Sequence, residues 1–291
     1  MRVTVVGAGL MGAQIGCEYA LGGHEVRLVA RVAASARGRF ERALALVEEL
    51  GLVAPDRVED ARARTVAGSD LRAAAACDLA VESLPEDLGL KAELLRVVAE
   101  ASPRALIASN TSSLSITELG EAIGAPDRTI GTHYWNPPLL MPLVEIVPGD
   151  RTRPDAVARV EGLLRELGKR PFVARDVPGF VWNRLQNAVL REAVWLVENG
   201  VASPETVDEV LRYGLGRRWR HVGLFESIAL GGPATWQRVA ANLLPSLSAA
   251  TELPDLGRWV GGDPARLEDL VRRRDRGLAE DLARDAREGG A

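Results

Sequence analysis

Short apolar runs and longer amphipathic stretches alternate along the first part of the chain. The runs are rich in β-branched residues, as buried parallel strands are. They lie at Val3–Val6, Val26–Val29, Leu79–Glu82, Ala105–Ser109, Arg128–His133, Leu143–Val147 and Phe172–Ala174. Stretches between them, such as Ser35–Leu50 and Leu88–Ala101, repeat apolar residues at helical spacing. This alternation predicts an α/β domain, in which a mostly parallel sheet has helices on both faces and binds ligands beyond the carboxyl ends of its strands.

The pattern becomes helical after a break at Val177-Pro178-Gly179. Apolar residues then recur at helical spacing as far as Asn199-Gly200. Leu267–Ala286 carries dense charges of both signs, as the solvated face of a helix does. We therefore predict an α/β domain over residues 1–178 and an all-α C-terminal domain over residues 179–291.

Composition and charge narrow the class of partner. The 291 residues are 47% hydrophobic and carry a formal net charge of -4, so we expect no nucleic-acid partner. No apolar run is long enough to span a membrane, and we read no signal peptide at the start of the chain. Two cysteines, Cys17 and Cys77, are too few for a disulfide framework or a cysteine-rich metal site, which favours a reducing, cytoplasmic setting.

The segment GAGLMG follows the first apolar run and opens a helical stretch. Its glycines, Gly7, Gly9 and Gly12, have the G-x-G-x-x-G order of a Rossmann-type domain. There they permit a tight turn, a close backbone approach to a pyrophosphate, and close packing of the helix. With Leu10 and Met11 they begin a helix whose N–H groups face the anion. Since a second strand follows on schedule, we expect a bound dinucleotide.

The residue that usually selects NAD is missing. An acid normally ends the second strand and holds the ribose hydroxyls, but Ala30 and Arg31 stand there. Either Arg31 faces a 2′-phosphate, which favours NADP, or it is a solvated surface residue and NAD binds without the acid. The sequence leaves both alternatives open.

His133 ends one apolar run, and Glu145 lies within the next, after the turn Asn136-Pro137-Pro138. If this turn folds one strand beside the other, the carboxylate fixes the tautomer of an imidazole that takes a proton from a hydroxyl. A lone histidine is more often structural, but a strand end beside a dinucleotide crevice favours a catalytic base. The segment SNTSSLSITEL, which begins before Asn110, supplies helix caps and, beyond these, a polar rim to the pocket.

Two polar features of the second half have alternative interpretations. Asn183, near the start of a helix, is by its pattern a surface residue, or it points into the crevice. Arg217, Arg218 and Arg220 flank Trp219. This cluster binds a carboxylate or phosphate through bidentate contacts, or it contacts another subunit.

The segments GAGLMG, SNTSSLSI, HYWNPPLLMPLVEIV and DVPGFVWNRL occur in this order and spacing. With them the chain resembles the L-3-hydroxyacyl-CoA dehydrogenase family over roughly residues 1–235. NPPLLMPLVEIVP and GLGRRW look closer to the L-gulonate 3-dehydrogenase (lambda-crystallin) and carnitine dehydrogenase group. The family has a Rossmann-type domain followed by a helical domain that dimerises. The resemblance therefore implies a homodimer, with residues 179–291 serving substrate binding and dimerisation.

The resemblance also implies roles for individual residues. At the reacting carbon it implies the base His133, its partner Glu145, and the substrate contacts Ser112 and Asn183. The expected cofactor contacts, besides the GAGLMG loop, are Arg31, Glu86, Lys91, Asn110, Ser112 and Asn136. Arg218 is the candidate cation for a substrate carboxylate.

The expected activity is hydride transfer between a nicotinamide and C3 of an L-3-hydroxy acid or its acyl-CoA thioester. NAD is the expected cofactor, with NADP left open by Ala30-Arg31. The helix after the second strand lacks the lysine cluster that the acyl-CoA enzymes use near the CoA end. Two alternatives remain: an enzyme of free 3-hydroxy acids only, gulonate- or carnitine-like, and a non-catalytic, crystallin-like relative. No metal is expected.

Overall fold

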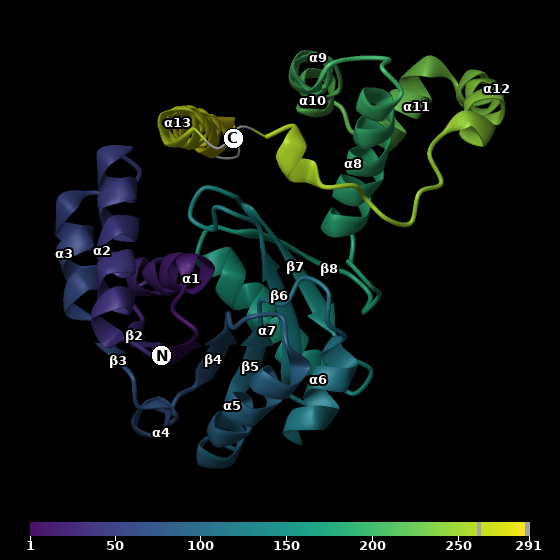
Figure 1. Cartoon of the computed structure of the whole chain (residues 1–291). Helices are drawn as coiled ribbons and strands as arrows, with labels where there is room; N and C mark the ends of the chain where they lie inside the picture. The colour runs from purple at the N-terminus through teal and green to yellow at the C-terminus, as the bar shows by residue number, and fades with distance from the viewer. Residues whose placement is uncertain (261–262, 289–291) are drawn as a thin grey trace. The chain divides into compact units, whose positions relative to one another are not determined.

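The computed structural model describes residues 1–260 and 263–288, which form two compact units (Figure 1). The first unit takes in Met1–Val181 and the chain from Ala265 onward, and the second unit is Trp182–Pro264. The last helix, α13 (Pro264–Glu288), therefore belongs almost entirely to the first unit. The boundary drawn from the sequence between residues 178 and 179 stays a prediction.

An eight-stranded sheet organises the first unit. Its order is β3-β2-β1-β4-β5-β6-β7-β8, and neighbouring strands are parallel except for the antiparallel pair β6 and β7. The strands are β1 (Arg2–Val6), β2 (Glu25–Val29), β3 (Thr65–Gly68), β4 (Leu79–Glu82), β5 (Leu106–Ser109), β6 (Thr129–Tyr134), β7 (Leu143–Pro148) and β8 (Arg170–Val173). The predicted mostly parallel sheet is confirmed.

Strand residues alternate between two apolar layers, because successive side chains of a strand point to opposite faces. Val5 and Ala108 pack in the layer that holds α1 (Leu10–Leu21), α2 (Ala33–Glu49), α3 (Pro55–Ala63) and α7 (Pro154–Glu166). Val6 and Ile107 pack in the other layer, with α5 (Leu88–Ala101) and α6 (Ile116–Ile123), near the short α4 (Leu71–Ala74). Burial on both faces explains the continuous apolar runs in the sequence.

The second unit is helical, as predicted. Its elements are α8 (Trp182–Glu198), α9 (Pro204–Glu209), η1 (Val210–Leu215), α10 (Gly216–Trp219), α11 (Leu224–Gly231), α12 (Pro233–Leu243), η2 (Leu244–Ser246) and η3 (Leu256–Arg258). Among its described residues only Val194, Ser227 and Ser248 are buried. Nowhere in residues 1–260 and 263–288 does a helix combine the length and the hydropathy of a membrane-spanning segment.

Candidate active site

Two glycines shape the loop between β1 and α1. Gly7 has a φ of 97°, in the left-handed region that residues with a side chain rarely adopt. A Cβ at Gly12 would lie 2.1 Å from the carbonyl oxygen of Gly7, so only glycine lets α1 start this close to the strand. Both residues are therefore required by the protein's own fold.

The packing around Gly9, by contrast, does not require a glycine. A Cβ at this position would meet no described atom within 4 Å. Gly9 is the N-cap of α1, and no side chain of the described residues caps this helix. The first-turn N–H groups, which include those of Leu10 and Met11, therefore remain available to an anion. A glycine that the packing does not need, at an uncapped helix start, fits the pyrophosphate of a dinucleotide.

A cavity of about 670 Å³ adjoins this loop, where β1, β2 and β4 end. Its lining includes the glycine loop, Ala30-Arg31 after β2, and Ser83–Pro85 after β4. Apolar side chains form much of the remaining wall: Val6, Val29, Val32, Leu71, Leu84, Leu90 and Leu94. The cavity has the size and largely apolar character of a cofactor site, and it lies where the Rossmann-type fold binds a dinucleotide.

The antiparallel strands β6 and β7 bring His133 and Glu145 together. The sequence predicted this arrangement on the condition that the turn Asn136-Pro137-Pro138 folds one strand beside the other. The two residues stand directly opposite each other in the register. Nδ1 of His133 lies 2.6 Å from Oε2 of Glu145, and the carboxylate is fully buried. The backbone N–H of Val181 donates to Oε1 of Glu145 at 2.9 Å, and Nε1 of Trp135 donates to Oε2 at 3.4 Å. These contacts fix the ring so that Nε2 is the nitrogen left for a ligand.

A turn after β8 packs an aromatic ring against this pair. The Phe180 ring meets the His133 imidazole edge on, with centroids 5.8 Å apart and an interplanar angle of 60°. Phe180 has a φ of 46°, which is rare for a bulky residue, and its N–H donates to the carbonyl of Val177 at 2.9 Å. Phe180 and Trp135 both lie within motifs that the sequence analysis quoted, but it gave neither residue a role in the site.

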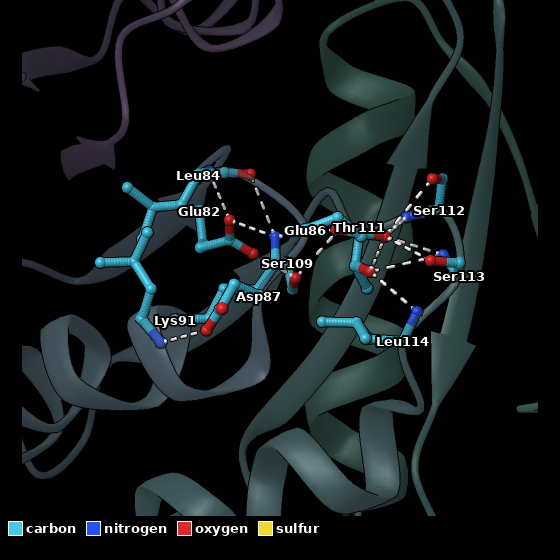
Figure 2. Close-up of polar contacts among 11 residues, drawn as sticks. Glu82, Leu84, Glu86, Asp87, Lys91, Ser109, Thr111, Ser112, Ser113 and Leu114 are labelled. Carbon is cyan, nitrogen blue, oxygen red and sulfur yellow. Dashed lines mark hydrogen bonds and ion pairs between the residues drawn. The ribbon is translucent and has the colours of Figure 1, made fainter.

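Glu86 accepts several hydrogen bonds from the hydroxyl-rich loop that follows β5 (Figure 2). Its Oε1 accepts a hydrogen bond from Thr111 Oγ1 at 2.6 Å and from the backbone N–H groups of Ser112 and Ser113, both at 2.9 Å. Burial disfavours the charged carboxylate, but the donors from Thr111 and Ser112 and the nearby Lys91 ammonium together lower its pKa to about 2. An ionised Glu86 therefore fixes the backbone of Ser112.

Lys91 and Glu86, both expected around the cofactor, belong to one ionic network with a third residue. Lys91 is 1% exposed, and its Nζ lies 2.6 Å from Oε1 of the fully buried Glu82 and 3.2 Å from Oε2 of Glu86. Ser109 Oγ donates to the other oxygen of Glu82, which ties β4 to β5 (Figure 2). The sequence did not single out Glu82, because acids at positions 82, 86 and 87 all precede Lys91 and nothing in their order indicates which is buried.

The remaining predicted residues are less closely connected to the pair. Asn110 Oδ1 accepts from the N–H of Tyr134 at 2.8 Å, which holds the loop after β5 beside the strand of His133. Asn136 is exposed in the turn after β6. Asn183, half-buried on α8, and Arg218, exposed on α10, lie in the second unit. The functional roles of all these residues stay predictions.

Two family models match the chain: 3-hydroxyacyl-CoA dehydrogenase, NAD binding domain, over residues 2–177, and the C-terminal domain of the same family over residues 179–253. A 5-formyl-3-hydroxy-2-methylpyridine 4-carboxylate 5-dehydrogenase from Mesorhizobium japonicum is 34% identical over 254 residues, which are 85% of this chain and 81% of the relative. An L-carnitine dehydrogenase from a Pseudomonas species is 41% identical over 179 residues, which are 61% of this chain and 55% of the relative.

A solved structure is similar over nearly the whole chain. It is that of a 5-formyl-3-hydroxy-2-methylpyridine 4-carboxylic acid 5-dehydrogenase, described as an NAD+-dependent dismutase. The TM-score is 0.88 at 29% sequence identity, and the match covers 99% of this chain and 98% of the other. The likeness extends through both the sheet unit and the helical unit.

Proposed function

The chain belongs to the 3-hydroxyacyl-CoA dehydrogenase family, and on this premise we propose that it oxidises the 3-hydroxyl carbon of an L-3-hydroxy acid, reversibly. It is an NAD-dependent dehydrogenase, and NAD, when bound, supplies the acceptor for the hydride that leaves C3. The observation that carries the proposal is the buried contact of 2.6 Å between His133 Nδ1 and Glu145 Oε2, which leaves Nε2 to face a substrate.

In this proposal His133 acts as the general base. Nε2 takes the proton of the substrate hydroxyl as the carbon is oxidised to a carbonyl, and it returns the proton in the reverse direction. Glu145 stabilises the imidazolium that forms and keeps the ring in one tautomer. Ser112, on the loop fixed by Glu86, and Asn183 are the proposed contacts to the substrate oxygen.

Replacement of the base tests the assignment. His133→Gln keeps a side chain of similar polarity but removes the proton acceptor, so turnover should fall about 100- to 10,000-fold. Binding of NADH, measured by fluorescence titration, should stay within about twofold, a change of under 0.5 kcal/mol. His24→Gln, at the amino end of β2, is the matched control and should keep full activity. Turnover close to wild type in His133→Gln would refute the base.

We propose a small free acid, rather than a CoA thioester, as the substrate. Two similar proteins are named for carnitine and for a pyridine carboxylate, and Arg218 offers an exposed cation for a carboxylate. Steady-state kcat/KM with L-carnitine, L-gulonate and 3-hydroxybutyryl-CoA would choose between the classes. A preference for the thioester would overturn this part. Absence of any absorbance change at 340 nm with every substrate would favour a non-catalytic, crystallin-like role.

We also propose that the protein is a homodimer. The helical unit exposes large apolar side chains, among them Leu185 at 61%, Phe225 at 83% and Leu230 at 78%. Monomeric proteins rarely leave so much apolar surface in water, whereas obligate dimers cover it with a second copy. Light scattering during size-exclusion chromatography should give twice the mass of 31.2 kDa. A monomer at micromolar concentration would contradict the proposal.

A further inference from the structure

The cavity beside the glycine loop has an unusual charge for an NAD site. Rossmann-type domains that bind NAD usually place an acid after the second strand, which holds the ribose hydroxyls and repels a 2′-phosphate. Ala30 stands there in this chain, and the described lining contains Arg31 and Arg39 but no carboxylate. The ribose end of the crevice is therefore cationic.

Three polar side chains line this end. Ser35 and Arg39 are four residues apart on α2 and so share one face of the helix, while Arg31 lies just before it. Arg31 is exposed and has no hydrogen bond or ion pair with any residue in the described ranges. Arg39 donates from Nη1 to the carbonyl oxygen of Ala8, at a long 3.4 Å. Both guanidinium groups keep donors for a ligand.

The acid on α2 that could neutralise them is occupied elsewhere. Glu41 pairs with Arg37 at 2.7 Å and with Arg62 at 2.9 Å, and it does not line the cavity. Arg37 also donates to the carbonyl of Thr65 at 2.8 Å. Arg37 therefore has a structural role, and its neighbours Arg31 and Arg39 do not share it.

We propose that this end of the crevice binds the 2′-phosphate of NADP through Arg31 and Arg39. The protein then accepts NADP as well as NAD, and it binds the phosphorylated form more tightly. A guanidinium can donate two parallel N–H groups to a phosphate, which a ribose hydroxyl cannot match. The inference concerns the coenzyme alone and does not depend on which hydroxy acid is the substrate.

Calorimetric titration of the whole 291-residue chain with NADPH, and separately with NADH, measures binding without turnover. We expect NADPH to bind about tenfold more tightly than NADH, as charge-assisted hydrogen bonds to one phosphate allow. Arg31→Ala should raise the Kd of NADPH about tenfold and leave that of NADH within about twofold. Arg39→Ala should act in the same direction. Arg42→Ala, also exposed on α2 but outside the cavity, is the matched control and should change neither Kd.

Two outcomes would overturn the proposal. One is wild-type protein that binds NADH as tightly as NADPH or more tightly. The other is an Arg31→Ala variant in which the Kd values of NADPH and NADH rise by the same factor. Arg31 would then contact a part of the dinucleotide that both forms share. Displacement of NADPH by 2′,5′-ADP at lower concentration than by 5′-ADP should locate the effect at the 2′ position. Thermal unfolding of each variant would confirm that the fold is retained.

Discussion

The two units differ in how far their apolar side chains are buried. The first buries both faces of its sheet, and even its ion pair of Lys91 and Glu82 lies almost wholly out of water. The second has three buried residues in its described part, and it exposes Phe225 at 83%. The first unit therefore has a large buried core of its own, whereas the second leaves large apolar side chains exposed, as surfaces that bind a partner do.

The strongest test of this contrast lies inside the first unit. Lys91→Met keeps the length of the side chain but leaves the buried Glu82 without its cation. Loss of one partner of a buried pair costs about 3–5 kcal/mol, so the free energy of unfolding in urea should fall by that amount. Arg104→Met, an exposed change after α5, is the control and should stay within about 0.5 kcal/mol. Equal effects of the two changes would break the contrast.

Within the same unit, alanine substitutions at Gly12 and Gly9 should distinguish a role in packing from a role in ligand binding. Gly12→Ala forces a Cβ to 2.1 Å from a backbone oxygen and should destabilise the fold by about 3 kcal/mol, the upper part of the range for overpacking. Gly9→Ala has open space around its Cβ and should leave the melting temperature unchanged, while NADH binding weakens about tenfold or more. Calorimetry measures both quantities. A Gly9→Ala variant that melts early would contradict the assignment of Gly9 to the cofactor.

In the second unit, a polar change at the most exposed aromatic should affect assembly rather than folding. Phe225→Asp should raise the dimer dissociation constant about tenfold, as loss of one buried interface side chain does. NADH binding to the first unit should not change. Sedimentation velocity over a concentration series measures the assembly, with Glu226→Asp as a neighbouring control. An unchanged dissociation constant would place Phe225 outside the interface.

The last expected effect, which is confined to acid pH, is the pH dependence that Glu86 gives to the first unit. Its folded pKa of about 2 lies below the ordinary value of 4.5, so its stabilising contribution is present above pH 4.5 and is lost as the pH falls through 2. Between these values unfolding of the wild type should take up about one more proton than unfolding of Glu86→Gln. The slope of unfolding free energy against pH gives this difference. Parallel slopes would contradict the depressed pKa.

The fold of the first unit could be predicted because its strands are buried on both faces and so carry apolar runs that nothing else in the sequence imitates. β3 was missed because its four residues, TVAG, lie at the sheet edge and form no such run. The His133–Glu145 pair could be predicted because one turn decides whether the strands meet. Long-range contacts resisted prediction: that Val181 N–H binds Glu145, or that Phe180 packs on His133, depends on where a distant turn returns to the sheet.

The antiparallel step between β6 and β7 also limits how this enzyme can evolve. His133 and Glu145 are opposite partners across two strands. If one residue were deleted from or inserted into the connection and the register shifted by one to accommodate it, Val144 or Ile146 would stand opposite the imidazole in place of Glu145. Both alternatives are aliphatic. The length of the segment from Trp135 to Pro142 is thus as much a part of the proposed proton-transfer apparatus as the two side chains themselves.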